Sequence, residues 1–331
     1  ATNSAAGTLY YSVDSGFSWA QVTGVSDSSA LLLDADDRLY WQPVADANGT
    51  VSDALTFRAW DVTVAEGGNL RDVSINGNDT AYSTATDTVA VTVNNINDAP
   101  VLDTTPVLAL TGIAEDAGVP VNGTTTGSTL ISTLTGGISD IDAGALKGIA
   151  ITAARADAGT LYFSVDDGAS WTQAAAVSET HALLLGADDR VAWVPTADSH
   201  GMVAEVVTFR AWDVTTGEGA GEYTQIAGRS FSSAADTVDL AITAVNDAPT
   251  VTAGDTHLLT GTDEDTTSVA TLVSAILTGI EQADVDAGAQ SGMAVTALSG
   301  HGSWQFSTDG ASWTAFPVVS DAAALLLGST T

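Results

Sequence analysis

The sequence contains no cysteine, so no disulfide can hold its segments together. Basic residues are scarce: 8 lysines and arginines stand against 41 aspartates and glutamates, and Lys147 is the single lysine. The resulting net charge of −33 is repelled by a nucleic acid backbone and by an anionic membrane surface. No apolar run approaches the roughly 20 residues that a membrane-spanning helix needs. We therefore expect neither a nucleic acid partner nor membrane insertion.

The sequence does contain enough apolar material for folded domains, since 45% of its residues are hydrophobic. The many acidic residues have two interpretations. They form a solvated surface that keeps the chain soluble, or some of them are ligands of a hard cation. A bound cation would be the staple that a cysteine-free chain otherwise lacks. The recurrence of their positions favours the second interpretation.

The sequence repeats itself at a long period. The segment Gly7–Trp19 returns as Gly159–Trp171, and a shorter third copy spans Gly302–Trp313. Thr56–Asp61 likewise recurs as Thr208–Asp213. Such self-similarity predicts an array of like modules. We expect the C-terminal part of one repeat in residues 1–98, a complete repeat in 99–247, and the N-terminal part of a further repeat in 248–331.

The periodicity within each module is that of β-strands. Apolar and polar residues alternate at 88–93 and 237–243, as in half-buried strands. Other segments are rich in β-branched and aromatic residues: 9–13, 39–41, 51–60, 161–165, 191–194 and 203–212. Segments 29–33 and 181–185 are candidate helical turns, and no amphipathic run is long enough for a proper helix. We therefore predict an all-β fold of tandem antiparallel β-sandwich modules.

Three acidic signatures recur once per module. They are Asn95-x-Asn97-Asp98-Ala-Pro100 with Asn246-Asp247-Ala-Pro249, Glu115-Asp116 with Glu264-Asp265, and Asp140-x-Asp142-x-Gly144 with Asp284-x-Asp286-x-Gly288. An Asp-x-Asp pair on an extended segment places both carboxylates on one face, about 7 Å apart. Ca²⁺ takes six to eight oxygen ligands from carboxylates, amides and backbone carbonyls. The signatures therefore predict Ca²⁺ binding, and the alternative is that Asn-Asp-Ala-Pro turns merely cap strands.

These signatures resemble the calcium motifs Asp-x-Asn-Asp-x-x-Pro and Asp-x-Asp-x-Gly of cadherins. The whole repeat is similar to the cadherin-like tandem repeats of giant bacterial surface proteins and RTX-type adhesins. The resemblance covers essentially all 331 residues. It implies immunoglobulin-like sandwiches, Ca²⁺ at the junctions, and a location outside the cell, secreted or on the cell surface.

The resemblance also implies the ligands. At the first junction they would be Asn95, Asn97, Asp98, Asp140 and Asp142, and at the second Asn246, Asp247, Asp284 and Asp286. Glu115 and Asp116 match the early acid of a module, which in cadherins serves the junction at the far end of that module. Asp61 and Asp213 end equivalent strands, and each either reaches a cation or caps a turn. The sequence departs from the motif at its first linker position, which is Asn95 in one copy and Ala244 in the other.

Two further motifs predict structure rather than chemistry. Ser12-x-Asp14-x-Gly16-x-x-Trp19 and its copy from Ser164 to Trp171 fit the Asp-box pattern, a β-hairpin whose aspartate bonds the amides of the turn. Arg58 and Arg210 stand beside Trp60 and Trp212, and we expect them to pair with a local acid or to stack on the aromatic ring.

No catalytic constellation is present, because the four histidines do not recur between modules and no Gly-x-Ser-x-Gly elbow occurs. We do not expect an enzyme. The sequence predicts a Ca²⁺-stiffened stalk segment of a large bacterial adhesin or biofilm matrix protein, with neighbouring repeats as its partners. One alternative is a subunit of an extracellular filament whose modules are completed by strand addition between like chains. Another is a carbohydrate-binding module that would present Trp19, Trp171 and Trp313 to surface glycans.

Overall fold

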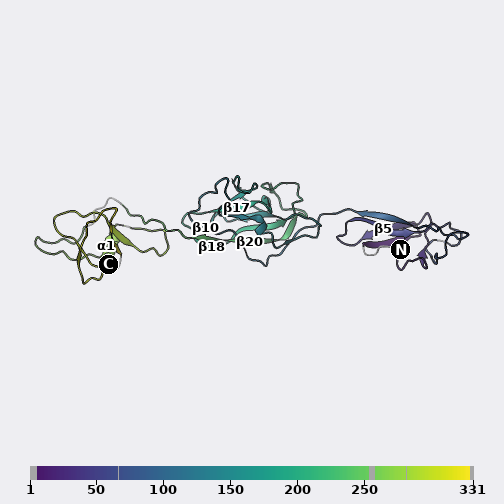
Figure 1. Cartoon of the computed structure of the whole chain (residues 1–331), viewed down its shortest axis with the longest axis horizontal. Helices are drawn as coiled ribbons and strands as arrows, with labels where there is room; N and C mark the ends of the chain where they lie inside the picture. Colours follow the sequence, from purple (N-terminus) through teal and green to yellow (C-terminus); the bar gives the residue numbers. More distant parts are fainter. Residues whose placement is uncertain (1–5, 66, 253–257, 281, 329–331) are drawn as a thin grey trace.

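The computed structural model describes residues 6–65, 67–252, 258–280 and 282–328. Its strands form three groups, β1–β7, β8–β20 and β21–β24, and no strand pairing joins one group to another among the described residues. Figure 1 shows the three groups as separate units along the long axis, connected by thin segments. We call them the first, central and third units.

The first unit consists of three small sheets. β1 (Gly7–Ser12) pairs with β2 (Ala20–Gln21) and β4 (Arg38–Pro43). β5 (Gly49–Phe57) pairs with β7 (Asp87–Val93), and β3 (Ala30–Leu31) pairs with β6 (Leu70–Arg71). All of these pairings are antiparallel.

The central unit is a sandwich of two sheets. The larger has the order β10-β20-β18-β13-β16-β19, with β9 also paired to β20, and the smaller has the order β11-β17-β14-β15. The larger sheet comprises β9 (Leu108–Ala109), β10 (Ile113–Ala114), β13 (Gly148–Ala154), β16 (Ala182–Gly186), β18 (Gly201–Trp212), β19 (Tyr223–Thr224) and β20 (Phe231–Thr243). The smaller comprises β11 (Ser128–Leu130), β14 (Gly159–Ser164), β15 (Thr172–Gln173) and β17 (Arg190–Pro195). A separate pair joins β8 (Val101–Leu102) to β12 (Ile138–Ser139), and a 3-10 turn spans Ile131–Thr133.

The third unit has less regular structure. β21 (Gly292–Val295) pairs with β24 (Leu325–Gly328), and β22 (Gln305–Phe306) pairs with β23 (Thr314–Ala315). The helix α1 (Val273–Gly279) lies before them in the chain. Val273 and Leu277 of this helix are buried with Leu327 in a small core.

The main hydrophobic core lies between the two sheets of the central unit. Ile149, Ile151, Leu183, Leu185 and Phe209 are all buried there. A smaller cluster on the opposite face of the larger sheet contains Ala150, Leu184 and Trp212. Alternate residues of each strand therefore face different layers, as the period of two requires.

The all-β fold and the predicted strands are confirmed, with boundaries that shift by a few residues. The predicted helical turns at 29–33 and 181–185 are wrong, since Ala30–Leu31 and Ala182–Gly186 are strands. Fully buried strands carry continuous apolar runs, and periodicity alone does not separate such a run from a helical turn. The short helix α1 was not expected. No helix in the described part of the chain is both long and apolar enough to cross a membrane.

Candidate metal centre at the junctions

The second junction begins where β20 ends, at Thr243. The parallel pairing of β10 with β20 places Ala114 beside Thr243 and so brings Glu115 to the start of the linker. Glu115 is buried, at 3% exposure. Its Oε1 accepts a hydrogen bond from the Val245 amide at 2.6 Å, and its Oε2 lies 3.0 Å from His200 Nδ1. The bond from the Val245 amide is the main reason that the pKa of Glu115 is lowered. The central unit therefore holds the linker through an ionised carboxylate.

The third unit holds the same linker from the other side. The Asp247 amide donates to Asp286 Oδ2 at 2.8 Å, and the Asp286 amide donates to Asp284 Oδ1 at 2.9 Å. A bridge between Thr250 and Ala283 brings the Asp284–Asp286 loop beside the linker. The two aspartates of the Asp-x-Asp motif thus have different roles: Asp286 accepts the hydrogen bond from the linker, and Asp284 accepts one from within its own loop.

Three carboxylates meet at this junction. Ligand oxygens of Glu115, Asp247 and Asp286 all lie within 4.8 Å of one another. They come from the central unit, the linker and the third unit. The Asn246 side chain donates to the backbone carbonyl of Asp247 at 2.8 Å.

In this cluster, Asp247 has a carboxylate oxygen that no described group stabilises. Its Oδ2 is buried and has no hydrogen-bond partner among the described residues. Burial raises the pKa of Asp247, and the neighbouring charges of Asp116, Asp198, Asp286 and Glu115 raise it further. A divalent cation would reverse both effects, since it supplies a partner for the buried oxygen and neutralises the repulsion. The donor set consists of carboxylate oxygens, which suits Ca²⁺.

The first junction repeats the same backbone contacts. The Asp98 amide donates to Asp142 Oδ2 at 2.8 Å, and the Asp142 amide donates to Asp140 Oδ1 at 2.8 Å. Asp140 Oδ2 is buried without a hydrogen-bond partner in the described structure. The same hydrogen bond, from the amide of the linker aspartate to the second aspartate of the Asp-x-Asp loop, therefore occurs at both junctions.

The electrostatics of the first junction differ. Asp98 forms an ion pair with Arg229, with 3.2 Å between Oδ1 and the guanidinium. Asn97 Nδ2 donates to Asp213 Oδ2 at 2.7 Å and to the Arg229 carbonyl at 3.0 Å. An arginine from the central unit thus neutralises the linker aspartate whose counterpart, Asp247, has no basic partner among the described residues.

Asp213 caps a turn, which is one of the two roles predicted for it. Its Oδ1 accepts hydrogen bonds from the amide and hydroxyl of Thr215, while its Oδ2 binds Asn97. Asn95 Oδ1 accepts a hydrogen bond from Asn48 of the first unit at 3.1 Å, and no hydrogen bond among the described residues links Asn95 to these groups. Asn97, Asp98, Asp140, Asp142 and Asp213 therefore come together at the first junction, and Asn95 does not join them.

Sequence reasoning missed three residues at the junctions. His200 contacts Glu115, the charge of Asp198 helps to raise the pKa of Asp247, and Arg229 pairs with Asp98. The sequence did carry a signal for Asp198, since Asp198 matches Asp46 of the first unit at a spacing of 152. Both aspartates adopt a φ of 59°. His200 and Arg229 have no like residue in the first unit, so recurrence gives no signal for them.

The predicted structural motifs are confirmed. Asp14 accepts hydrogen bonds from the Ser18 amide and hydroxyl, and Asp166 accepts the same pair from Ser170. Arg58 pairs with Asp27 and Arg210 with Glu179. These residues serve the hairpins and strands of single units.

Comparison with protein-family models, curated proteins and solved structures gives no match for this chain.

Proposed function

We propose that this chain is a stalk segment of a large bacterial adhesin or matrix protein, secreted or anchored at the cell surface, in which Ca²⁺ stiffens the junctions between cadherin-like repeats. The observation that carries the proposal is the carboxylate cluster of the second junction. Each of its three members belongs to a different part of the chain, so one cation bound there would tie two units to the linker between them.

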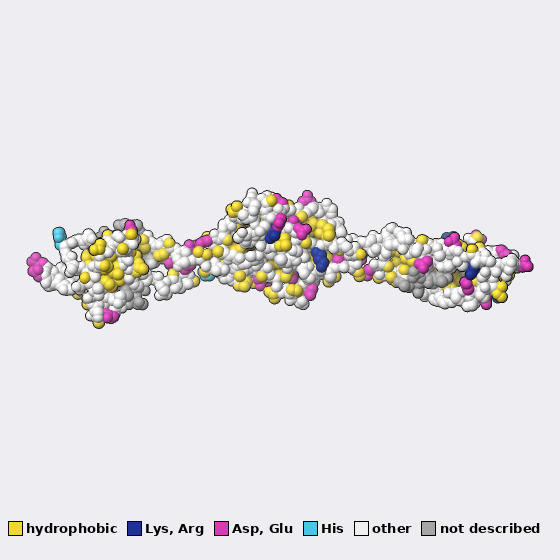
Figure 2. All heavy atoms as spheres, in the orientation of Figure 1, with side chains coloured by type: hydrophobic (Ala, Val, Ile, Leu, Met, Phe, Trp, Pro, Cys, Tyr) yellow, Lys and Arg dark blue, Asp and Glu magenta, His cyan; other side chains and the backbone are white. Residues whose placement is uncertain are grey.

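The physical mechanism is linkage between binding and geometry. Without a cation, the repulsion around Asp247 opposes the compact junction. A bound Ca²⁺ stabilises only those arrangements in which Glu115, Asp247 and Asp286 converge, and so it favours the extended, rigid chain by mass action. The acidic side chains spread along the molecule in Figure 2 keep such a stalk soluble and discourage lateral association.

At the first junction, Arg229 supplies a positive charge to the linker aspartate, so Ca²⁺ would act there beside an existing ion pair.

The test is calorimetric titration of the chelated chain with CaCl₂, followed by thermal melting in millimolar Ca²⁺ and in chelator. We expect saturable binding and a rise in melting temperature with Ca²⁺. Asp247→Asn and Asp286→Asn should each weaken the binding by at least about tenfold, because each removes a charged ligand. Asp36→Asn, which removes one charge from an exposed turn of the first unit, is the matched control and should leave binding unchanged.

Coincident melting curves with and without Ca²⁺, together with no heat of binding, would rule out the proposal. The acids would then be a solvated surface. Equal loss of binding in Asp36→Asn and Asp247→Asn would also contradict it, since the binding would then be non-specific charge screening.

A further inference from the structure

The loop between β17 and β18 ends beside the second junction. Gly201, the first residue of β18, pairs with Ile242 of β20, and Ile113 of β10 pairs with the same isoleucine. β20 therefore lies between β10 and β18, and Figure 1 labels the three strands together in the central unit. His200, which precedes β18, and Glu115, which follows β10, thus approach the linker from opposite sides of β20.

His200 contacts Glu115 across the end of β20. Its Nδ1 lies 3.0 Å from Glu115 Oε2. The histidine side chain is 33% exposed, whereas the glutamate side chain is 1% exposed. Because an ionised carboxylate only accepts hydrogen bonds, Nδ1 carries the proton and donates it to the bond. In the neutral ring, Nε2 then has no proton.

Both oxygens of the Glu115 carboxylate therefore have a donor. The Val245 amide bonds Oε1 at 2.6 Å, and His200 bonds Oε2. Each carboxylate oxygen has more than one acceptor site, so these bonds leave room for a cation on the same oxygens. The two bonds order a flexible side chain before any cation binds, and so they reduce the entropy that cation binding costs.

The same loop position reaches a linker in the first unit. The loop before β5 matches the loop before β18 at a spacing of 152, and Asn48 is the counterpart of His200. β5 pairs antiparallel with β7 as β18 pairs with β20, so each loop ends beside the linker that follows. Asn48 Nδ2 donates to Asn95 Oδ1 of its linker at 3.1 Å. This position therefore supplies a hydrogen-bond donor to a junction in both units, although the residue type differs.

We propose that His200 is a positioning residue of the second junction, whose Nδ1–H holds the Glu115 carboxylate in the orientation that a divalent cation requires. The inference rests on the proposed function, since it gives His200 a part in cation binding. The converging ligand oxygens belong to Glu115, Asp247 and Asp286, so the histidine acts through Glu115. Without its bond, one donor alone holds the carboxylate, and the cation must order the rest of the side chain.

The test is calorimetric titration of the whole chain with CaCl₂. The heat that Asp247→Asn removes identifies binding at the second junction. His200→Leu keeps a side chain of some bulk but removes the donor, and it should weaken this binding by about 10–100-fold, as loss of a bond to a metal-ligating carboxylate does.

Two further variants complete the test. His200→Asn keeps a nitrogen donor at the same number of bonds from the backbone, as Asn48 does, and should restore binding to near that of the parent chain. His181→Leu makes the same substitution at a ring that stacks on Tyr223, and this matched control should leave binding unchanged.

A second measurement needs no cation. In chelator at pH 9, ¹⁵N NMR of the imidazole ring of His200 should show the proton on Nδ1, because the bond to Glu115 selects that tautomer. A free neutral histidine carries its proton mostly on Nε2. A ring that merely fills space would therefore show the opposite tautomer.

The outcomes separate this inference from the proposed function. Equal Ca²⁺ binding by the parent and His200→Leu chains would overturn the inference and leave the proposed function standing. Weak binding by both His200→Leu and His200→Asn would also overturn it, since the shape of the ring would then matter rather than its donor. A proton on Nε2 in the parent chain would do the same. A parent chain that binds no Ca²⁺ would refute the proposed function itself, and the positioning role with it.

Discussion

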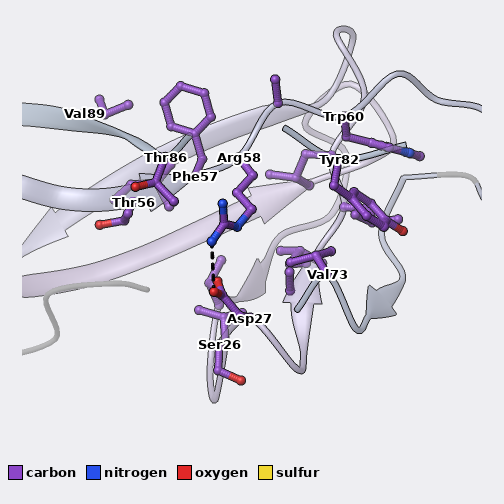
Figure 3. A pocket seen from close by; sticks show the side chains of 18 of the residues that line it. Ser26, Asp27, Thr56, Phe57, Arg58, Trp60, Val73, Tyr82, Thr86 and Val89 are labelled. Carbon is purple, nitrogen blue, oxygen red and sulfur yellow. Dashed lines mark hydrogen bonds and ion pairs between the residues drawn. The ribbon is translucent and has the colours of Figure 1, made fainter. Parts of the chain in front are cut away.

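The central and first units present the same residues in two environments. From β14 to β18, the central unit matches the first unit at a constant spacing, yet Leu183, Leu185 and Phe209 are completely buried while their counterparts are partly open: Leu31, Leu33 and Phe57 (Figure 3). In the central unit β13 covers these side chains, and the positions that would correspond to β13 in the first unit fall before residue 3, outside the described residues. Local sequence therefore sets where strands form, and a strand remote in the sequence sets what they bury.

The largest difference between the units should appear on truncating the matched phenylalanines. Phe209→Ala opens a cavity in a closed core and should destabilise the central unit by about 3–5 kcal/mol. Phe57→Ala removes a side chain that is already 44% exposed and should cost the first unit less than about 1.5 kcal/mol. Scanning calorimetry of the intact chain, with the transitions of the units resolved, measures both. Equal losses would mean that the Phe57 side chain is as well packed in solution as that of Phe209.

A hydrogen bond inside a hairpin should contribute equally to the stability of both units, because it joins residues only four positions apart. Ser164 accepts a hydrogen bond from the Gly168 amide at 2.8 Å, and Ser12 accepts one from Gly16 at 2.8 Å. Both serines are 2% exposed. Ser164→Ala and Ser12→Ala should therefore cost their units similar amounts, about 1–3 kcal/mol each, by leaving an amide without its partner.

Denaturant unfolding of the two serine variants and the parent chain measures these costs. Ser178→Ala, at a hydroxyl that is exposed and bonds only Thr180 in the described structure, is the control and should have little effect. A much smaller loss for Ser12→Ala than for Ser164→Ala would show that the hairpin, too, depends on the complete sheet.

The aspartates of the same hairpins predict an acid dependence shared by both units. Hydrogen bonds from Ser18 lower the pKa of Asp14 to about 2, and those from Ser170 lower the pKa of Asp166. A carboxylate with a lowered pKa in the folded state contributes stability above its unfolded pKa of about 3.9, and this contribution is lost as the pH falls toward the folded value. Melting temperatures between pH 5 and pH 2 should fall less steeply in Asp14→Asn and Asp166→Asn than in the parent chain. A slope unchanged in either variant would contradict the assignment.

The sequence was sufficient for the features that depend on local pattern. Alternation at 88–93 and 237–243 predicted β7 and β20, and the recurring Asp-box residues predicted the hairpin contacts. The continuous apolar run of β16 was ambiguous, because a strand buried on both faces loses the alternation that identifies it.

The candidate site was only partly predictable from the sequence. The repeated acids predicted Asp142 and Asp286, which bind their linkers through equivalent amides. The contacts of Glu115 with Val245 and His200 arise from the parallel pairing of β10 with β20, which joins residues about 130 positions apart in the chain. Spacing within a motif carries no information on such a pairing.

The smallest expected effect concerns the junction that joins the two compared units. Arg229 is 65% exposed, so its ion pair with Asp98 should contribute less than about 1 kcal/mol. Arg229→Gln should slightly lower the melting temperature in chelator at 50 mM salt, and the difference should vanish at 500 mM salt because exposed pairs are screened. Arg155→Gln, which breaks an exposed pair with Asp157 inside the central unit, is the matched control. Added Ca²⁺ should restore the Arg229→Gln chain but not the Arg155→Gln chain, since only the former leaves a linker aspartate for the cation to neutralise. Equal rescue of both variants would contradict the interpretation that Arg229 takes the place of a cation at the first junction.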